Sequence, residues 1–305
     1  GVASDRILVG FDAPSAAVPV GEPQSPPAAA VAGASSGYLI DPRANDSFTV
    51  VNRVLKAGVP VQRLDGEAGM FHVPSTAAAL AVLGPAAAET GVAVAASPRR
   101  IGEGLHEIHA PRIALWDQYG GSMVSGWTRL VLESFGFDYE VVYPQAITAG
   151  GLRERFDVLI LPSGAFPAAE ALAIEGKTRH APRRQDHAKV PAAFQHMLGE
   201  LDDSALPALR AFLDAGGHII ASGSSTGLAL SLGLPIRSHL RKVGDDGRDR
   251  ALRQHEYYIP GSVLSVAVDT THPVASGLPQ RLDLYFSDGR WDNAPVFDLP
   301  DGHRG

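Results

Sequence analysis

One short segment of the chain has residue types that could carry out nucleophilic catalysis. The run GSSTG at residues 223–227 fits the pattern G-x-S-x-G, and it follows an apolar segment at residues 218–222 that is typical of a strand. A serine on a sharp turn between a strand and a helix can attack a carbonyl carbon when a neighbouring base takes its proton. The pattern therefore makes Ser225 a candidate nucleophile, and a serine hydrolase is one hypothesis for this chain.

A serine hydroxyl without a positioned base is a poor nucleophile, so the hydrolase hypothesis needs a histidine near Ser225. His272 is the candidate base, although the run Thr271-His272-Pro273 is also typical of the start of a turn. His255 is the other possibility, and Glu256 follows it directly. The hypothesis predicts that His272 or His255 lies within hydrogen-bond reach of the Ser225 hydroxyl.

A second group of side chains raises the question of a metal site. His106, Glu107 and His109 lie close together in the segment that joins the two halves of the chain. Imidazole and carboxylate groups are common zinc ligands, but solvated or hydrogen-bonded histidines are the interpretation that we favour here. The chain has no cysteine, which excludes thiolate metal sites, disulfides and a cysteine nucleophile.

The elements that would position these residues begin with the stretch from Pro111 to Tyr143. An apolar run at residues 113–116 predicts a buried strand, and Ser122 can cap a helix that ends at a glycine, Gly136. Inside that helix Trp127, Leu130 and Val131 recur at helical spacing, which predicts an apolar stripe packed on a sheet with Trp127 in the core. A following strand at residues 139–143 completes a right-handed parallel unit.

Two further apolar runs, at residues 156–161 and 218–222, predict additional strands of the same sheet. Ligands of parallel sheets bind beyond the carboxyl ends of the strands, so the loops after three strands should converge on one concavity. The ligand-binding candidates in these loops are Asp117, Tyr119, Ser163, Gly164 and Ser225. If the polar insertion from Pro167 or the aromatic tail from Tyr285 fills the concavity with apolar side chains, the region is better interpreted as structural.

The rest of the chain divides by composition. Residues 1–36 contain a strand-like start and a linker or arm rich in proline and alanine, and residues 99–110 are a linker. Residues 37–98 alternate strand and helix patterns and predict a small α/β subdomain, in which Ser75 caps the second helix and Pro85 kinks or splits it. Residues 237–254, charged and rich in glycine, predict a mobile surface loop.

Two segments resemble a known family. Many bacterial zinc carboxypeptidases of the carboxypeptidase A type have a class I glutamine amidotransferase-like domain behind the catalytic domain. One segment of this chain resembles the start of that domain, at Ser122, Met123, Gly126, Trp127, Thr128, Arg129, Leu132, Glu133, Phe135, Gly136, Phe137 and Tyr139. A second segment resembles the same family, at Asp41, Asn45, Ser47, Phe48, Val51, Asn52, Arg53 and Leu55. The similarity therefore extends over most of the chain.

This resemblance implies a three-layer α/β architecture with a parallel sheet. An amidotransferase-like, flavodoxin-type domain at residues 111–305 would follow the smaller α/β subdomain. Class I amidotransferases carry cysteine where this chain has Ser225, so the alternative function is a serine hydrolase or a degenerate amidotransferase that uses Ser225. No histidine here has a glutamate three residues later, as a zinc peptidase of this type requires. The implied function is a non-catalytic accessory region, structural, regulatory or ligand-binding, of a zinc metallocarboxypeptidase. The zinc would belong to a catalytic domain absent from this chain, and no cofactor is expected here.

The net charge and the hydropathy of the chain limit the classes of partner that we expect. The 305 residues carry a formal net charge of −7 and no apolar run that could span a bilayer, so neither nucleic acid nor membrane is an expected partner. The expected partners are the peptidase domain of the same protein or a small-molecule or peptide ligand. The resemblance implies a secreted or periplasmic location. No signal peptide is visible within the chain, and we expect the targeting sequence upstream of Gly1.

Overall fold

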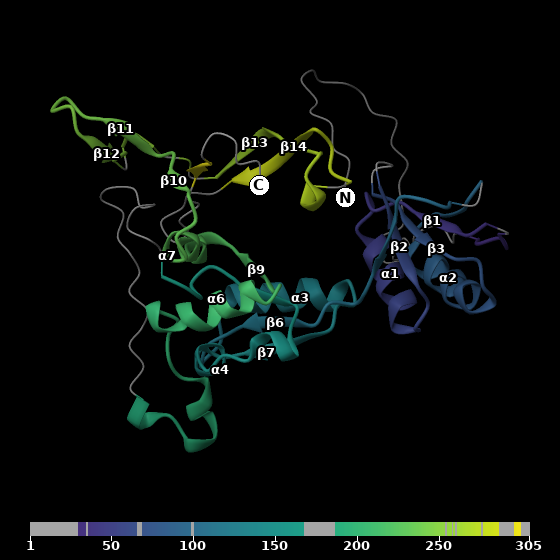
Figure 1. Ribbon diagram of the computed structural model, residues 1–305, viewed down its shortest axis with the longest axis horizontal. Coiled ribbons are helices and arrows are strands. Elements are labelled where there is room, and N and C mark those ends of the chain that lie inside the picture. The colour runs from purple at the N-terminus through teal and green to yellow at the C-terminus, as the bar shows by residue number, and fades with distance from the viewer. Residues whose placement is uncertain are drawn as a thin grey trace, which may run out of the picture. The chain divides into compact units, whose positions relative to one another are not determined.

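The computed structural model of the chain (Figure 1) forms two compact units. Residues 1–110 and 273–278 belong to the first unit, and residues 111–272 and 279–305 to the second. The structure describes residues 30–34, 36–65, 69–98, 101–167, 187–253, 255–257, 259, 261–275, 277–286 and 296–299. Predictions for the N-terminal arm before residue 30 therefore lie outside the described residues.

The first unit contains a five-stranded antiparallel sheet with the strand order β4-β1-β3-β2-β5. Its elements are β1 (Tyr38–Ile40), α1 (Asp46–Lys56), β2 (Val61–Leu64), β3 (Phe71–Val73), α2 (Ala77–Thr90), β4 (Val94–Ala96) and β5 (Leu105–Ile108). The first six elements follow the β-α-β-β-α-β pattern of split βαβ domains. Strands and helices alternate over residues 37–98, as the sequence patterns predict.

A hydrophobic cluster joins the two helices to one face of this sheet. The helices contribute Val50, Val51, Val54, Ala79, Leu83 and Ala86, and the strands contribute Tyr38, Ile40, Val61, Phe71 and Val73. Alternate residues of β1 and β3 point into this cluster, as period-two strands with one face against helices require. The core of the first unit is therefore a single layer of side chains between a sheet and a helix pair.

Three local predictions for the first unit are wrong. Residues 99–110 are more than a linker, because β5 lies there and pairs with β2. Helix α2 continues through Pro85, so the predicted split into two helices is wrong; the carbonyl of Ala81, to which proline cannot donate, belongs to an exposed residue that water can reach. Its N-cap is Thr76, whose hydroxyl accepts a hydrogen bond from the Ala79 N–H at 3.0 Å, and not Ser75.

The second unit is built on a parallel sheet with the strand order β7-β6-β8-β9. Its strands are β6 (Ile113–Trp116), β7 (Tyr139–Val142), β8 (Val158–Leu161) and β9 (His218–Ala221). Its main helices are α3 (Met123–Ser134), α4 (Pro144–Thr148), α5 (Leu152–Arg155) and α6 (Leu206–Asp214). The chain leaves β6 toward β7 and later leaves β8 toward β9, so the order of connections reverses between β6 and β8. The predicted strands and the predicted crossover helix are confirmed.

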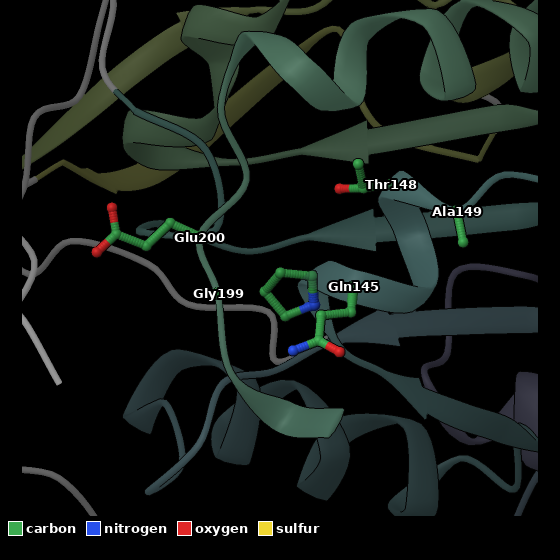
Figure 2. Close-up of a pocket in the computed structure, with 6 residues that line it drawn as sticks. Gln145, Thr148, Ala149, Gly199 and Glu200 are labelled. Atoms are coloured by element: carbon green, nitrogen blue, oxygen red, sulfur yellow. The ribbon is translucent and has the colours of Figure 1, made fainter. Parts of the chain in front are cut away.

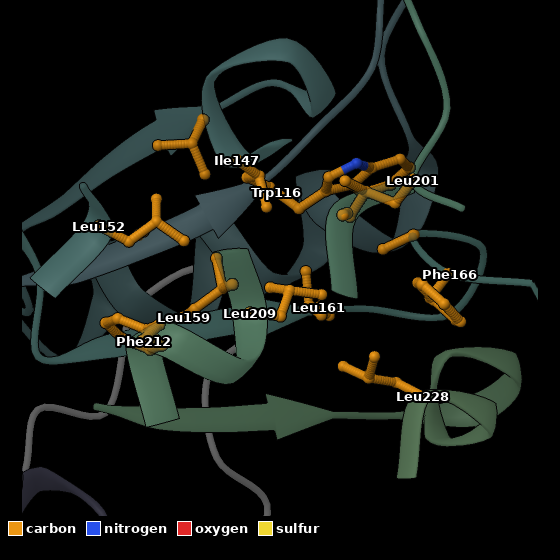
Figure 3. Packing of buried hydrophobic residues seen from close by; sticks show 14 of the residues in the cluster. Trp116, Ile147, Leu152, Leu159, Leu161, Phe166, Leu201, Leu209, Phe212 and Leu228 are labelled. Carbon is orange, nitrogen blue, oxygen red and sulfur yellow. The ribbon is translucent and has the colours of Figure 1, made fainter. Parts of the chain in front are cut away.

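Hydrophobic clusters lie on both faces of this sheet. One face packs on α4, α5 and α6 through a large cluster (Figure 3) that contains Ala114, Trp116, Val142, Ile147, Leu152, Phe156, Leu159, Leu161, Leu209 and Phe212. The other face packs on α3 through a smaller cluster formed by Ile113, Leu115, Leu132 and their partly buried neighbours. The chain is thus a mixed α/β protein, with one parallel sheet and several antiparallel ones.

The orientation of α3 differs from the prediction. Trp127 is 63% exposed, and Leu130 and Val131 are 51% and 54% exposed, so the apolar stripe faces away from the sheet. The helix instead seats Ser125 and Leu132 on the sheet, and the Ser125 hydroxyl donates to the Trp116 carbonyl at 2.8 Å. The prediction that Trp127 belongs to the core is therefore wrong.

Three short antiparallel pairs follow the parallel sheet. They are β10 (Arg237–Ser238) with β15 (Phe297–Asp298), β11 (Arg241–Val243) with β12 (Asp249–Ala251), and β13 (Ser262–Ala267) with β14 (Arg281–Phe286). The predicted mobile loop at residues 237–254 therefore contains a hairpin. Tyr285 on β14 is 75% exposed, while Trp291 lies outside the described residues. In the part of the chain described, no helix has the length and apolar character needed to cross a membrane.

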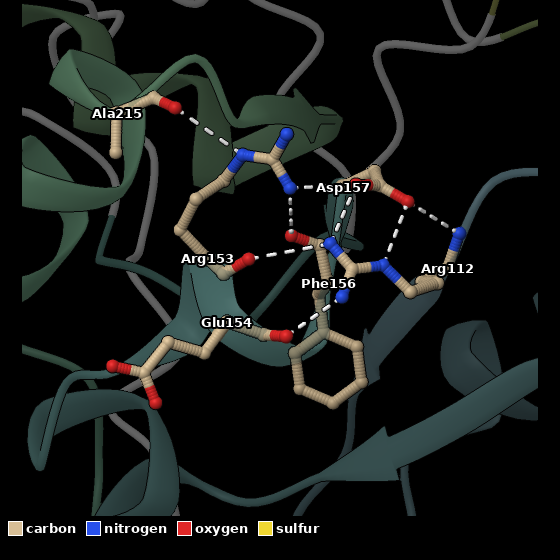
Figure 4. Close-up of polar contacts among 6 residues, drawn as sticks. All are labelled: Arg112, Arg153, Glu154, Phe156, Asp157 and Ala215. Atoms are coloured by element: carbon tan, nitrogen blue, oxygen red, sulfur yellow. Dashed lines mark hydrogen bonds and ion pairs between the residues drawn. The ribbon is translucent and has the colours of Figure 1, made fainter.

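An ion-pair network ties together the amino ends of β6 and β8 (Figure 4). Asp157 accepts from Arg112 through Nη2 at 2.8 Å, through Nε at 3.0 Å and through the backbone N–H at 2.9 Å. Arg153 donates to the same carboxylate at 2.6 Å. The hydrogen bonds from Arg112 hold the pKa of Asp157 well below its usual range.

This lowered pKa predicts a specific pH dependence. The hydrogen bonds of the folded protein favour the ionised form of Asp157. The carboxylate therefore stabilises the fold above the ordinary aspartate pKa of about 3.9, and this contribution is lost as the pH falls toward the pKa in the folded protein. We expect Asp157→Asn to be less stable than the wild type at neutral pH, with a difference that shrinks as the pH falls below about 4. Urea unfolding at a series of pH values measures this, and a difference that stays constant with pH would contradict it.

Candidate functional site

The carboxylate of Asp117, directly after β6, holds its own loop in a closed turn. Its Oδ1 accepts from the backbone N–H groups of Gln118 at 2.8 Å and Ser122 at 2.7 Å, and its Oδ2 forms an ion pair with Arg129 of α3. Only 4% of Asp117 is exposed. Because this carboxylate is buried and fully engaged, it organises the start of α3 and is not directed at a ligand.

The next residues of this loop are more accessible. Gly120 and Gly121 have φ angles of 84° and 80°, which favour glycine, and a Cβ atom on either would meet nothing within 4 Å. The half-buried Tyr119 ring lies 6.1 Å from the Phe194 ring, measured between centroids. The outer side of the loop is therefore open at the glycines and covered at Tyr119.

Ser225 lies on a 3₁₀ turn, η5 (Gly223–Gly227), between β9 and the short helix α7 (Leu228–Ser231). Its side chain is fully buried. The Ser225 hydroxyl donates to the Pro162 carbonyl at 2.6 Å and accepts from the Phe166 N–H at 3.0 Å. These two bonds join the turn after β9 to the loop after β8, and they use the hydroxyl as a structural link.

The neighbouring side chains strengthen the same joint. The Ser224 hydroxyl accepts from the Gly164 N–H at 2.8 Å, and the Ser224 N–H donates to the Ser163 hydroxyl at 3.3 Å. Gly223 has a φ of 55°, and a Cβ there would lie 2.5 Å from the Ser163 hydroxyl oxygen. The two loops therefore pack too closely to leave a cavity between Ser163 and Gly223.

The structure does not bring a base to Ser225. Because both hydrogen bonds of its hydroxyl go to backbone groups, neither His272 nor His255 bonds it within the described part of the chain. The N–H of His272 donates to the Asp269 carbonyl in a turn after β13, as its position before a proline suggested, and His255 is exposed. We therefore assign neither Ser225 as a nucleophile nor His272 as its base.

The end of the polar insertion that begins at Pro167 packs on the sheet. Leu198 and Leu201 are 2% and 1% exposed, and Leu201 belongs to the cluster that contains Trp116. A 3₁₀ helix, η3 (Ala192–Met197), places Phe194 against Tyr119 and His196 against Tyr143. Apolar and aromatic side chains thus cover the carboxyl ends of β6 and β7.

An open groove of about 390 Å³ lies beside the carboxyl end of β7 (Figure 2). It is lined by Pro144, Gln145, Thr148, Ala149, Gly199 and Glu200. None of the five candidate ligand-binding residues lines it. Sequence patterns did not indicate this groove, because Gly199 and Glu200 reach α4 through the end of an insertion with no regular period.

The five candidates separate into two sets. Ser163, Gly164 and Ser225 are brought together through the contacts of η5, while Asp117 and Tyr119 follow the adjacent strand β6. All lie at the carboxyl edge of the sheet, because the strands are parallel. Asp117, Ser163 and Ser225 have their side-chain oxygens hydrogen-bonded within the protein, so the open backbone at Gly120, Gly121 and Gly164 is the accessible part of this edge.

The segment with closely spaced histidines contains a hydrogen-bonded pair. His106 Nε2 lies 2.9 Å from Asp65 Oδ2 across β5 and the end of β2, and both side chains are about two-thirds exposed. Among the residues that the structure describes, no three His, Cys, Asp or Glu side chains gather as a metal site would require. The described residues therefore do not fit a zinc centre.

Comparison of the chain with protein-family models, with curated proteins and with solved structures found no match.

Proposed function

We propose that this chain is a non-catalytic accessory region of a zinc metallocarboxypeptidase involved in proteolysis. The observation that carries the proposal is the environment of Ser225. By the resemblance, its hydroxyl corresponds to the nucleophile of an amidotransferase-like enzyme, yet it is buried and bonded to Pro162 and Phe166. A hydroxyl in that state links two loops and is not available to a substrate.

The topology of the second unit supports an amidotransferase-like, flavodoxin-type domain. Numbered within the parallel sheet, the observed order is 2-1-3-4, which agrees with the first four strands of the order 2-1-3-4-5 of flavodoxin-like folds. Helices pack on each face through separate clusters, in agreement with a three-layer arrangement. The sequence resemblance at residues 122–139 falls on α3 and its flanking strand β7, within this same unit.

Two kinds of work are open to such a region. It supports or regulates the peptidase domain of its own protein, or it binds a small molecule or peptide at the carboxyl edge of the sheet. On this proposal zinc belongs to the catalytic domain, where it would polarise the scissile carbonyl, and this chain contributes no ligand to it. The resemblance further supports a secreted or periplasmic protein.

The proposal is tested by the reading frame upstream of Gly1. We expect it to encode a zinc peptidase domain, with a signal peptide before that domain. A reading frame that starts at or just before Gly1 would contradict the proposal.

A further inference from the structure

The three methionines of the chain differ in their access to solvent. Met123, the first residue of α3, is 81% exposed, whereas Met70 and Met197 are partly buried. Methionine carries a polarisable thioether that can be oxidised to a sulfoxide. The sulfur of Met123 is therefore the one that a small oxidant in solution meets most readily.

No thiol in this chain competes with the three thioethers for an oxidant. The chain has no cysteine, so its methionines contain all of its sulfur atoms. Cysteine thiolates, where a protein has them, react with peroxides and consume them. In their absence a peroxide that attacks sulfur reacts with methionine, and the rate at each methionine follows the exposure of its side chain.

The structure around Met123 tolerates the product of this reaction. The start of α3 is held by the Ser122 hydroxyl, which accepts from the Ser125 N–H, and by the Ser122 N–H, which donates to Asp117. Neither bond uses the Met123 side chain, and Met123 packs in neither of the hydrophobic clusters described for the second unit. Water can therefore solvate a sulfoxide oxygen at Met123 without the loss of a contact that holds the fold.

The reaction would change the polarity of the outer surface of α3. Met123 lies four residues before Trp127 and seven before Leu130, on the same side of the helix, and both of these side chains are more than half exposed. Conversion of a thioether to a sulfoxide replaces a flexible apolar group by a polar, chiral one. A single oxidation therefore places a polar group at one end of an apolar surface.

We propose that Met123 is a reversible oxidation site of this chain, with hydrogen peroxide as the class of oxidant. A lone pair of the Met123 sulfur attacks one peroxide oxygen, the O–O bond breaks, and the other oxygen leaves as water after it takes the proton of the transferred oxygen. A methionine sulfoxide reductase reverses the reaction: two thiols supply two electrons and become a disulfide, and the sulfoxide oxygen leaves as water. Each of the two reductase classes accepts one sulfoxide epimer, so complete repair requires both.

Peptide mapping by mass spectrometry after exposure to hydrogen peroxide at neutral pH tests the proposal. In the folded chain we expect Met123 to be oxidised on the order of ten-fold faster than Met70 and Met197, because its thioether is the most exposed. The control is the same chain unfolded in urea, in which the three methionines react at similar rates because the difference in exposure is lost. Equal rates in the folded chain, or the same preference for Met123 in urea, overturn the proposal.

Met123→Leu, a replacement of similar volume, provides the matched variant for a second readout. Brief peroxide treatment should make the wild type elute earlier from a hydrophobic-interaction column, and should leave the elution of Met123→Leu unchanged. Incubation with both reductases and a thiol reductant should restore the original elution, and the urea unfolding midpoint should be the same before and after oxidation. A sulfoxide at Met123 that the reductases leave in place, or that lowers the unfolding midpoint, overturns the proposal of a reversible site.

Discussion

Replacing Ser225 by alanine is expected to lower the free energy of unfolding of the second unit by about 2–5 kcal/mol. The substitution removes one hydroxyl that satisfies two buried backbone groups, the Pro162 carbonyl and the Phe166 N–H. Each unsatisfied buried group costs about 1–3 kcal/mol. Urea unfolding followed by tryptophan fluorescence measures the effect, because all three tryptophans lie between residues 111 and 305.

The matched control is the adjacent serine. Ser224 is only partly buried, and its hydroxyl accepts from the Gly164 N–H, which solvent can reach after the substitution. Ser224→Ala should cost about 0.5–1.5 kcal/mol. If Ser225→Ala were no more destabilising than Ser224→Ala, the structural role of Ser225 would be wrong.

The second large effect is expected at Asp117, where alanine should cost about 2–4 kcal/mol. The substitution leaves the N–H groups of Gln118 and Ser122 without their acceptor and leaves Arg129 without its ion-pair partner. Removing one member of a buried pair is strongly destabilising, and the value is moderated here because the Arg129 side chain is 34% exposed. The measurement is again the unfolding free energy in urea.

An exposed ion pair in the same sheet unit provides the comparison. Glu140 and Arg155 are paired with side chains 55% and 53% exposed. Pairs of this kind contribute roughly 0–1 kcal/mol, so Glu140→Ala should have little effect. Similar losses for Asp117→Ala and Glu140→Ala would show that the loop after β6 is not held by its carboxylate.

The strands of the second unit were predictable from sequence for a physical reason. Buried parallel strands are continuous apolar runs that end at glycine or polar turns, as at Trp116 and Leu161. The same reasoning found α3 through its cap Ser122 and its terminal Gly136. Element type and position follow from local pattern in these cases.

The face that α3 turns to the sheet was not predictable in this way. Helical period shows that an apolar stripe exists, but not which side of the helix meets the sheet. The rotation is set by the Ser125 hydroxyl on the Trp116 carbonyl and by Arg129 on Asp117. Two polar contacts outweigh the pattern, and the apolar stripe is left exposed.

The role of Ser225 likewise could not be predicted from the residues around it in the sequence. A G-x-S-x-G run describes a turn, and the same turn serves a nucleophile or a structural joint. The difference lies in what the hydroxyl meets, and its partners Pro162 and Phe166 are about 60 residues away in sequence. Strand β5 was missed for a similar reason, since its pairing with β2 and not its own composition makes it a strand.

Covalent labelling with a fluorophosphonate probe tests most directly whether this chain lacks catalytic activity of its own. Folded wild-type chain and Ser225→Ala are incubated with the probe, and the modified peptides are located by mass spectrometry. We predict no adduct at Ser225 in the wild type, because its hydroxyl is buried and bonded to two backbone groups. An adduct at Ser225 that is lost in Ser225→Ala would show an activated nucleophile and contradict the assignment of this region as non-catalytic.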